Sequence, residues 1–223
     1  MQTMMRYLAM GAAIAVMGFA AAAPARADIY SQPWDGTGNL YASQNDTTGG
    51  NGNFATVYDN FTLGTTSTVT GVDWVGGYFN PPTQGPITAF TISFYADSGG
   101  APGGLLASTS VSGTANETLL TGPNYSYTTA ITPFIAAAGT EYWMSIVPDL
   151  GFPPQWGWAS GTGGDGIAYQ DFFGSRSQLG TDLAFGLQGS PVVPEPSSLV
   201  LAGLGGMSFL VVYGWRRRRR ASV

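Results

Sequence analysis

The sequence contains no cysteine, no histidine and no lysine. Without cysteine and histidine there can be no thiol nucleophile, no Ser-His-Asp or Cys-His catalytic group, and no zinc site built on imidazole or thiolate. A chain without thiols also cannot mispair in an oxidising compartment, which is compatible with export. From the residues that remain we predict no cofactor, no metal ion and no catalytic residue.

Positive charge is scarce in the middle of the chain. Between Asp28 and Ser190, Arg176 is the only basic residue and stands against twelve carboxylates, a net charge of −11. Such a surface repels phosphate backbones, so we expect no nucleic-acid partner. An acidic surface rich in Gly, Thr, Ser and Asn suits an extracellular protein instead.

The first 27 residues have the pattern of a secretory signal peptide. An apolar run at 7–23 follows an arginine, and Ala25 and Ala27 form the small-x-small pattern that precedes Asp28. We predict a signal helix over 1–27, export by the Sec machinery, and cleavage by signal peptidase after Ala27. A membrane anchor or a buried helix is the alternative.

A second apolar segment lies near the end of the chain, at 199–215. Its 17 residues carry no charge, and as a helix they would be about 26 Å long, enough for a thin bilayer. A basic cluster follows directly: Arg216, Arg217, Arg218, Arg219 and Arg220. Because positive charge stays on the cytoplasmic side, we predict a transmembrane helix with a cytoplasmic tail at 216–223 and the preceding domain outside. An ordinary stop-transfer anchor has the same pattern.

Pro194, Glu195 and Pro196 stand just before this segment, inside a Pro-rich linker at 191–198. The order of tripeptide, apolar span and arginines resembles the PEP-CTERM sorting signal. The resemblance implies that exosortase, a membrane cysteine transpeptidase of bacteria that make extracellular polysaccharide, recognises the tail and removes it near the tripeptide. It further implies a transient inner-membrane intermediate with the domain in the periplasm, and then a place at the cell surface or in the extracellular matrix.

Residues 28–190 are predicted to form one all-β domain, because short β-branched and aromatic runs alternate with Gly, Pro and Asn clusters and no helical period appears. We expect an antiparallel, jelly-roll-like β-sandwich ectodomain with about eight to ten strands. It should follow an irregular lead-in that ends at Asn53 and contains at most one strand. The expected strands are Ala55–Leu63, Ser67–Phe79, Ile87–Ala96, Leu105–Val111, Ser126–Ile135, Thr140–Val147, Gln155–Ser160, Ile167–Phe172 and Leu183–Leu187.

The strand at Ile87–Ala96 shows the clearest alternation. Its one face carries Phe90, Ile92 and Phe94 and should face the core, whereas the other carries Thr91, Ser93 and Tyr95. The stretch at 140–147 is apolar on both faces, which is typical of a central strand covered on two sides. Motifs such as Tyr58-Asp59-Asn60-Phe61 and Gly139-Thr140-Glu141-Tyr142-Trp143 resemble a recurrent β-sandwich ectodomain of secreted PEP-CTERM proteins. That resemblance implies architecture and location, and no catalytic residue.

Aromatic residues in Gly-rich surroundings are candidates for stacking on sugar rings. We single out Trp156, Trp158 and Tyr169, and the wider set adds Trp34, Tyr41, Phe172 and Phe173. The alternative for Trp156 and Trp158 is core packing, and it is the favoured one because large aromatics usually fill sandwiches.

Two further kinds of site are weaker hypotheses. The acidic loops at 97–100 and 164–166 could supply oxygen ligands to calcium, although turn formation explains these aspartates better. A glycoside hydrolase needs two carboxyl groups, and Glu117 and Glu141 are the only glutamates of the domain. Their spacing gives no reason to place them together.

The sequence therefore favours a non-enzymatic surface or extracellular-matrix protein, associated with biofilm or exopolysaccharide and sorted through its tail. A carbohydrate-binding, lectin-like module is the alternative, and a glycoside hydrolase is the third interpretation.

Overall fold

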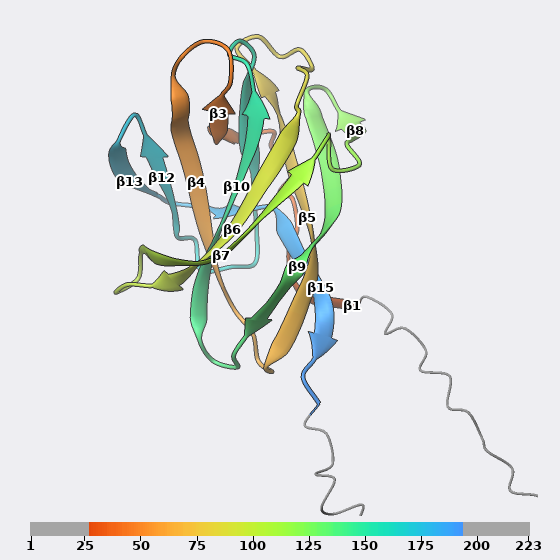
Figure 1. Ribbon diagram of the computed structural model, residues 1–223, viewed down its shortest axis with the longest axis vertical. Helices are drawn as coiled ribbons and strands as arrows, with labels where there is room; N and C mark the ends of the chain where they lie inside the picture. The colour runs from red at the N-terminus through yellow and green to blue at the C-terminus, as the bar shows by residue number, and fades with distance from the viewer. Residues whose placement is uncertain (1–26, 194–223) are drawn as a thin grey trace, which may run out of the picture.

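Two β-sheets pack face to face in the computed structural model, which describes residues 27–193 (Figure 1). This part of the chain contains strands, turns and loops and no helix, so the predicted all-β sandwich is confirmed. It follows that none of these residues belongs to a helix able to cross a bilayer. The predicted transmembrane helix at 199–215 lies outside the described residues, and so does the predicted signal helix apart from Ala27.

The first sheet, here called the β5 sheet, has eight strands and follows the order β1-β15-β5-β11-β14, with β2 paired to β11, β9 to β5 and β8 to β9. All of its pairs are antiparallel. Its strands are β1 (Ala27–Gln32), β2 (Leu40–Ala42), β5 (Ser67–Phe79), β8 (Thr118–Thr121), β9 (Asn124–Ala136), β11 (Gln155–Gly161), β14 (Asp182–Leu183) and β15 (Phe185–Pro191).

The second sheet, here called the β10 sheet, has seven strands in the order β13-β12-β4-β3-β10-β6-β7, with β4 also paired directly to β10. A short β3–β10 pair is parallel, and the other pairs are antiparallel. Its strands are β3 (Gln44–Asp46), β4 (Gly52–Thr62), β6 (Ala89–Asp97), β7 (Pro102–Ser112), β10 (Glu141–Leu150), β12 (Ala168–Phe172) and β13 (Ser175–Leu179).

The core lies between the inner faces of the two sheets and is rich in aromatic rings. Phe90, Ile92 and Phe94 of β6 all point into it, as their alternation predicted, and none is more than 2% exposed. From the β5 sheet, Trp74 stacks on Tyr127 with ring centroids 5.3 Å apart, and both rings contact Phe90. Rings of this size bury much apolar area, so they supply a large share of the stabilisation.

The indole of Trp156 packs directly on the backbone of β5 at Gly76, where a side chain is absent. A Cβ atom at Gly76 would collide with the indole of Trp156 and with the carbonyl oxygen of Gly157. Glycine thus lets β5 and β11 pair at normal spacing with a full indole between the sheets.

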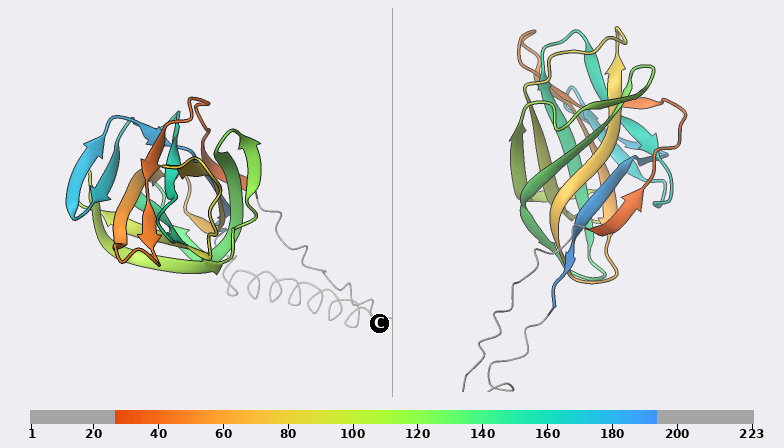
Figure 2. Two further views of the ribbon diagram at one scale, coloured as in Figure 1. Left: turned by 90° about the horizontal axis from the view of Figure 1, so that it is seen from above. Right: turned by 90° about the vertical axis from the view of Figure 1, so that its right-hand side faces the viewer.

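The β10 sheet curves until its two edge strands approach each other, as the view from above suggests (Figure 2). Arg176 of β13 donates a hydrogen bond from Nη1 to the carbonyl oxygen of Pro102, the first residue of β7, at 3.0 Å. The hairpin between β6 and β7 reverses where the sequence predicted, and Asp97 accepts hydrogen bonds from the backbone of Gly99 and Gly100 there. The curvature gives the sheet a hollow outer face.

Candidate functional site

The two ends of the described chain lie side by side at one end of the sandwich (Figure 1). Strands β1 and β15 pair in antiparallel register, with Ala27 opposite Gly189 and Gln32 opposite Phe185. Beyond β15, the backbone of Val192 donates one hydrogen bond to the carbonyl of Thr66 at 2.8 Å. The last strand of residues 27–193 ends at Pro191, before the Pro-Glu-Pro tripeptide begins.

A cavity of about 220 Å³ opens on the outer face of the β10 sheet. Its floor contains Ser93 of β6 and Ser145 of β10, which are direct cross-strand neighbours, and Tyr58 of β4 lies opposite Ser145 on the other side. Both serines are buried, at 4% and 1% exposure. Because two small side chains stand beside a large ring, a hollow forms above them.

One wall of this outer-face cavity consists of two tyrosine rings. Tyr58 and Tyr95 meet edge to face, with centroids 5.3 Å apart. The hydroxyl of Tyr95 bonds the hydroxyl of Ser145 at 3.2 Å, and Tyr58 donates to Asp171 at 3.1 Å. Burial, with the neighbouring Tyr95, raises the pKa of Tyr58 above its ordinary value, so this phenol stays neutral.

Arg176 supports that wall from behind. Its guanidinium lies 5.2 Å from the centre of the Tyr58 ring and donates to both carboxylate oxygens of Asp171, at 2.7 and 2.8 Å. These hydrogen bonds hold the pKa of Asp171 below its usual value. The single basic side chain of the domain is therefore engaged with a ring and a carboxylate.

The opposite wall carries two amides and a carboxylate. Asn45 donates from Nδ2 to Oδ1 of Asp149 at 2.8 Å, and Asn53 accepts from the hydroxyl of Thr56 at 3.2 Å. Within residues 27–193, neither Nδ2 of Asn53 nor Oδ2 of Asp149 has a hydrogen-bond partner. These groups remain open to a molecule in the cavity.

The indoles predicted to contact sugar do not reach this surface. Trp156 and Trp158 are both 0% exposed. Their Nε1 atoms donate inside the core, to the hydroxyl of Tyr127 at 3.1 Å and to the carbonyl of Ala184 at 2.9 Å. Neither indole offers a free ring face, so the core-packing alternative holds and a sugar contact by these two residues is wrong.

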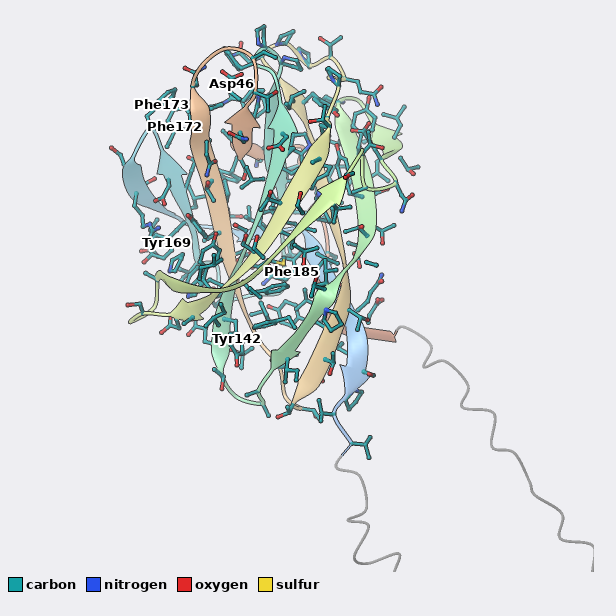
Figure 3. All side chains as sticks on the ribbon, in the orientation of Figure 1. Asp46, Tyr142, Tyr169, Phe172, Phe173 and Phe185 are labelled. Carbon is teal, nitrogen blue, oxygen red and sulfur yellow. The ribbon has the colours of Figure 1, made fainter. Side chains whose placement is uncertain are left out.

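Tyr169 differs from the two tryptophans in its position. It stands on β12 directly opposite Tyr58 and packs edge-on against Trp143, with centroids 5.4 Å apart (Figure 3). It is half-buried next to the cavity, so its predicted contact with a glycan stays a prediction.

The other candidate rings are scattered. Phe172, the last residue of β12, and Phe173, in the turn that follows, are 40% and 63% exposed and contact Phe54 (Figure 3). Tyr41 packs against the core, and Trp34 makes an isolated bridge to Gly161. The structure thus brings none of these four rings to the outer-face cavity.

The end of the sequence carries the remaining evidence. Residues 192–219 match the family model described as the PEP-CTERM protein-sorting motif. The chain carries a PEP-CTERM sorting motif. No curated protein matches the sequence. The motif marks an exported protein that is held at a membrane and processed by exosortase, which confirms the resemblance found in the sequence.

The PEP-CTERM motif begins at Val192, the residue after β15. Pro194, Glu195, Pro196 and the basic cluster at 216–220 lie beyond the described residues, as does Ala25. At the other end, Asp28 is exposed and pairs with Gln188. The predicted signal-peptidase site and the sorting motif thus flank the same pair of strands.

The carboxylates considered for glycoside hydrolysis belong to different parts of the sandwich: Glu117 directly precedes β8 of the β5 sheet, and Glu141 is the first residue of β10 in the other sheet. Glu117 accepts hydrogen bonds from the hydroxyls of Tyr78 at 2.6 Å and Tyr127 at 2.8 Å. Glu141 accepts from the amide of Asn60 at 2.8 Å. The structure therefore does not bring the two groups together around one bond.

The acidic loops considered for calcium use their carboxylates in turns. Asp97 also accepts a hydrogen bond from Nε1 of Trp143 at 2.9 Å, which lowers its pKa. Asp165 accepts from the backbone of Ile167 and from the amide of Asn60. Across residues 27–193, no group of three or more acidic side chains is arranged to hold a metal ion.

One carboxyl group is buried inside the sandwich. Asp59 is 0% exposed and accepts hydrogen bonds from the backbone of Leu183 at 2.6 Å and of Asn60 at 2.8 Å. Burial raises the pKa of Asp59 well above its ordinary value, in spite of these hydrogen bonds. The group ties β4 to β14 and lies away from the outer-face cavity.

Sequence reasoning missed five residues of the cavity, namely Asn45, Asn53, Thr56, Tyr58 and Asp149. It did place Thr91, Ser93 and Tyr95 together on the face that proves to line it. The same alternation in 56–60 would have put Thr56 and Tyr58 on one face. The pairing of β4 with β10, which brings that face to the cavity, joins residues far apart in the sequence and is not encoded in any local pattern.

Proposed function

We propose that residues 28–190 form a non-enzymatic surface or extracellular-matrix module, exported by the Sec machinery and released from its tail by exosortase. In this proposal the basic cluster stops transfer, the apolar segment holds the chain in the inner membrane, and the module stays in the periplasm until the tail is cut. The released module then associates with exopolysaccharide outside the cell.

The junction between fold and motif is the observation that supports this proposal most. The sandwich ends at Pro191 and the motif starts at Val192. A cut near the tripeptide therefore leaves every described strand and every described core residue in the released module. The released module keeps every hydrogen bond between β15 and its neighbours β1 and β5.

The acidic surface of the module supports a final place outside the cell. With a net charge of −11 between Asp28 and Ser190, the module repels other anionic surface material and resists clumping with it.

Intact mass spectrometry of the exported protein tests the proposal. The full chain is expressed in a host that encodes an exosortase and in the same host with that gene deleted. We expect a product that begins at Asp28 in both hosts, and one that lacks the tail only where the enzyme is present. A chain that keeps its last residue, Val223, in both hosts would sink the proposal.

A variant pair localises the recognition. Glu195→Ala within the tripeptide should leave the tail uncut in the exosortase host. Glu141→Ala, the matched loss of a carboxylate inside the domain, should be processed like the wild type. Equal processing of both variants would contradict a role for the tripeptide.

A further inference from the structure

We propose that the outer-face cavity of the β10 sheet binds one sugar residue of a neutral polysaccharide. The proposal goes beyond export and sorting, and it names a site and a ligand class. It is independent of the predicted indole contacts, because the cavity contains neither Trp156 nor Trp158.

The two walls of the cavity offer the two kinds of contact that a sugar needs. A pyranose has C–H groups that pack on aromatic rings and hydroxyls that bond amides and carboxylates. The half-buried ring of Tyr95 supplies the aromatic contact on one side, and the buried ring of Tyr58 packs against it and holds it in place. Asn53 and Asp149 supply an open donor and an open acceptor on the other.

The floor is polar and already rigid. Four hydroxyl-bearing side chains of the floor and of the adjoining tyrosine wall are each less than 9% exposed: Thr56, Tyr58, Ser93 and Ser145. Each has its hydroxyl bonded to a neighbouring side chain, for example Ser93 to Ser108 at 2.9 Å. Burial of a polar group costs free energy unless a hydrogen bond compensates for its lost hydration. A strand face that served packing alone would therefore carry apolar side chains. Here a hydroxyl-lined surface is held in place before any ligand arrives, which reduces the entropy lost on binding.

The size of the cavity sets the length of the ligand. At about 220 Å³, it is smaller than the roughly 300–1,000 Å³ typical of sites for drug-sized molecules. It therefore suits a single sugar residue, with the rest of a polymer extending out over the sheet.

Charge selects against acidic sugars. The module has a net charge of −11, and Asp149 lies in the cavity wall itself. The basic side chain near the site, Arg176, already bonds both oxygens of Asp171. A uronate or a sulfated sugar would meet repulsion without a free cation, whereas a neutral hexose would not.

A glycan array probed with the full-length protein in detergent micelles tests the proposal. The array carries neutral gluco-, galacto- and manno-oligosaccharides beside uronate-containing and sulfated ones. We expect binding to at least one neutral oligosaccharide, with a dissociation constant between about 1 μM and 1 mM. Binding to none of the neutral probes, or only to the acidic ones, would overturn the proposal.

Two substitutions then place the binding at the cavity. Thr91→Trp fills the space from an outer-face strand position and should abolish binding. Asn53→Ala removes the open amide and should weaken binding about tenfold. The matched control is Thr128→Trp, the same change at an exposed position of β9 in the β5 sheet, and it should bind like the wild type.

Each variant is compared with the wild type by circular dichroism, so that misfolding is separated from loss of a contact. Binding unchanged by Thr91→Trp in a folded protein would show that the sugar binds elsewhere, and the proposal would fall. Such a result would leave exosortase processing, measured by mass, unaffected.

Discussion

The aromatic side chains between the two sheets differ from those on the outer face of the β10 sheet in what surrounds their polar atoms. In the core, Trp156 donates to Tyr127, which in turn donates to the half-buried Glu117, so a chain of hydrogen bonds leads from the buried indole toward the surface. On the outer face, Tyr58 and Tyr95 bond Asp171 and Ser145 at the border of an open cavity. The same residue types thus stabilise the fold in one place and shape a surface in the other, and substitutions should separate the two.

The largest effect is expected from Trp156→Ala. The indole is fully buried and packs against Phe90 and Tyr127, so its loss leaves a cavity that the rigid sheets cannot close. Removal of such a ring costs about 3–5 kcal/mol of unfolding free energy, which chemical denaturation measures. Phe173→Ala, at a ring that is 63% exposed, should change the stability by no more than about 0.5 kcal/mol. Similar losses in the two variants would contradict the assignment of Trp156 to the core.

A matched pair of hydroxyl deletions compares the two regions directly. Tyr127→Phe leaves Nε1 of Trp156 buried without an acceptor and should cost about 1–3 kcal/mol. Tyr95→Phe removes one hydrogen bond to Ser145 at a partly buried site and should cost about 0.5–1.5 kcal/mol. Denaturant titrations of the two variants give the comparison. A larger loss of unfolding free energy for Tyr95→Phe than for Tyr127→Phe would contradict the expectation that the core hydroxyl contributes more to stability than the outer-face hydroxyl.

The buried Asp59 should make the stability depend on pH. Its pKa is raised in the folded protein, whereas in the unfolded chain it is near about 3.9. As pH rises through the interval between these two values, the unfolded chain releases a proton that the folded chain retains, so this group lowers the stability progressively. Asp59→Asn should remove that decline.

The measurement is the unfolding free energy of wild type and Asp59→Asn from pH 4 to pH 8. Asp46, Asp97 and Asp171 act in the opposite direction, because their pKa values are lowered in the folded state and their stabilisation is lost as pH falls. They are unchanged in the variant, so the difference between the two curves isolates Asp59. Parallel curves would show that Asp59 is ionised in the fold.

The smallest effect is expected from Arg176→Gln. The ion pair with Asp171 is partly exposed, with side-chain exposures of 41% and 30%. A pair of this kind contributes about 0.2–1 kcal/mol at low salt and less at about 1 M salt. Thermal unfolding at two salt concentrations measures it. A loss that did not shrink with salt would point to the hydrogen bond with Pro102, which joins the edges of the curved sheet.

Much of the fold could be predicted from local pattern. The expected strand Ser67–Phe79 coincides with β5, and the strand expected at Gln155–Ser160 lies within β11. The lead-in to Asn53, expected to be irregular with at most one strand, contains three strands, β1, β2 and β3. Those strands are short or polar. Apart from β4, which pairs with β3, their pairing partners lie at 141–191, more than a hundred residues away. Local alternation carries no information on such partners.

The candidate site was less accessible to sequence reasoning. Alternation correctly separated Tyr95 from Phe94, and the two-sided apolar pattern of 140–147 correctly indicated the central strand β10. The alternation could not predict the register in which β4, β10 and β6 pair. Ser145 meets Tyr58 on one side and Ser93 on the other only because three distant strands pair in one alignment, and a shift of one residue would turn each side chain to the opposite face.

The pairing of β1 with β15 has a consequence for the order of events during export. Strand β1 is the first part of the module to emerge and has β15 as its sole neighbour in the sheet. That neighbour is the last part to emerge, so the leading strand must wait unpaired until the whole module has crossed. In the proposed route, in which the tail holds the trailing end of the chain at the membrane, those two strands would have time to meet before exosortase removes the tail.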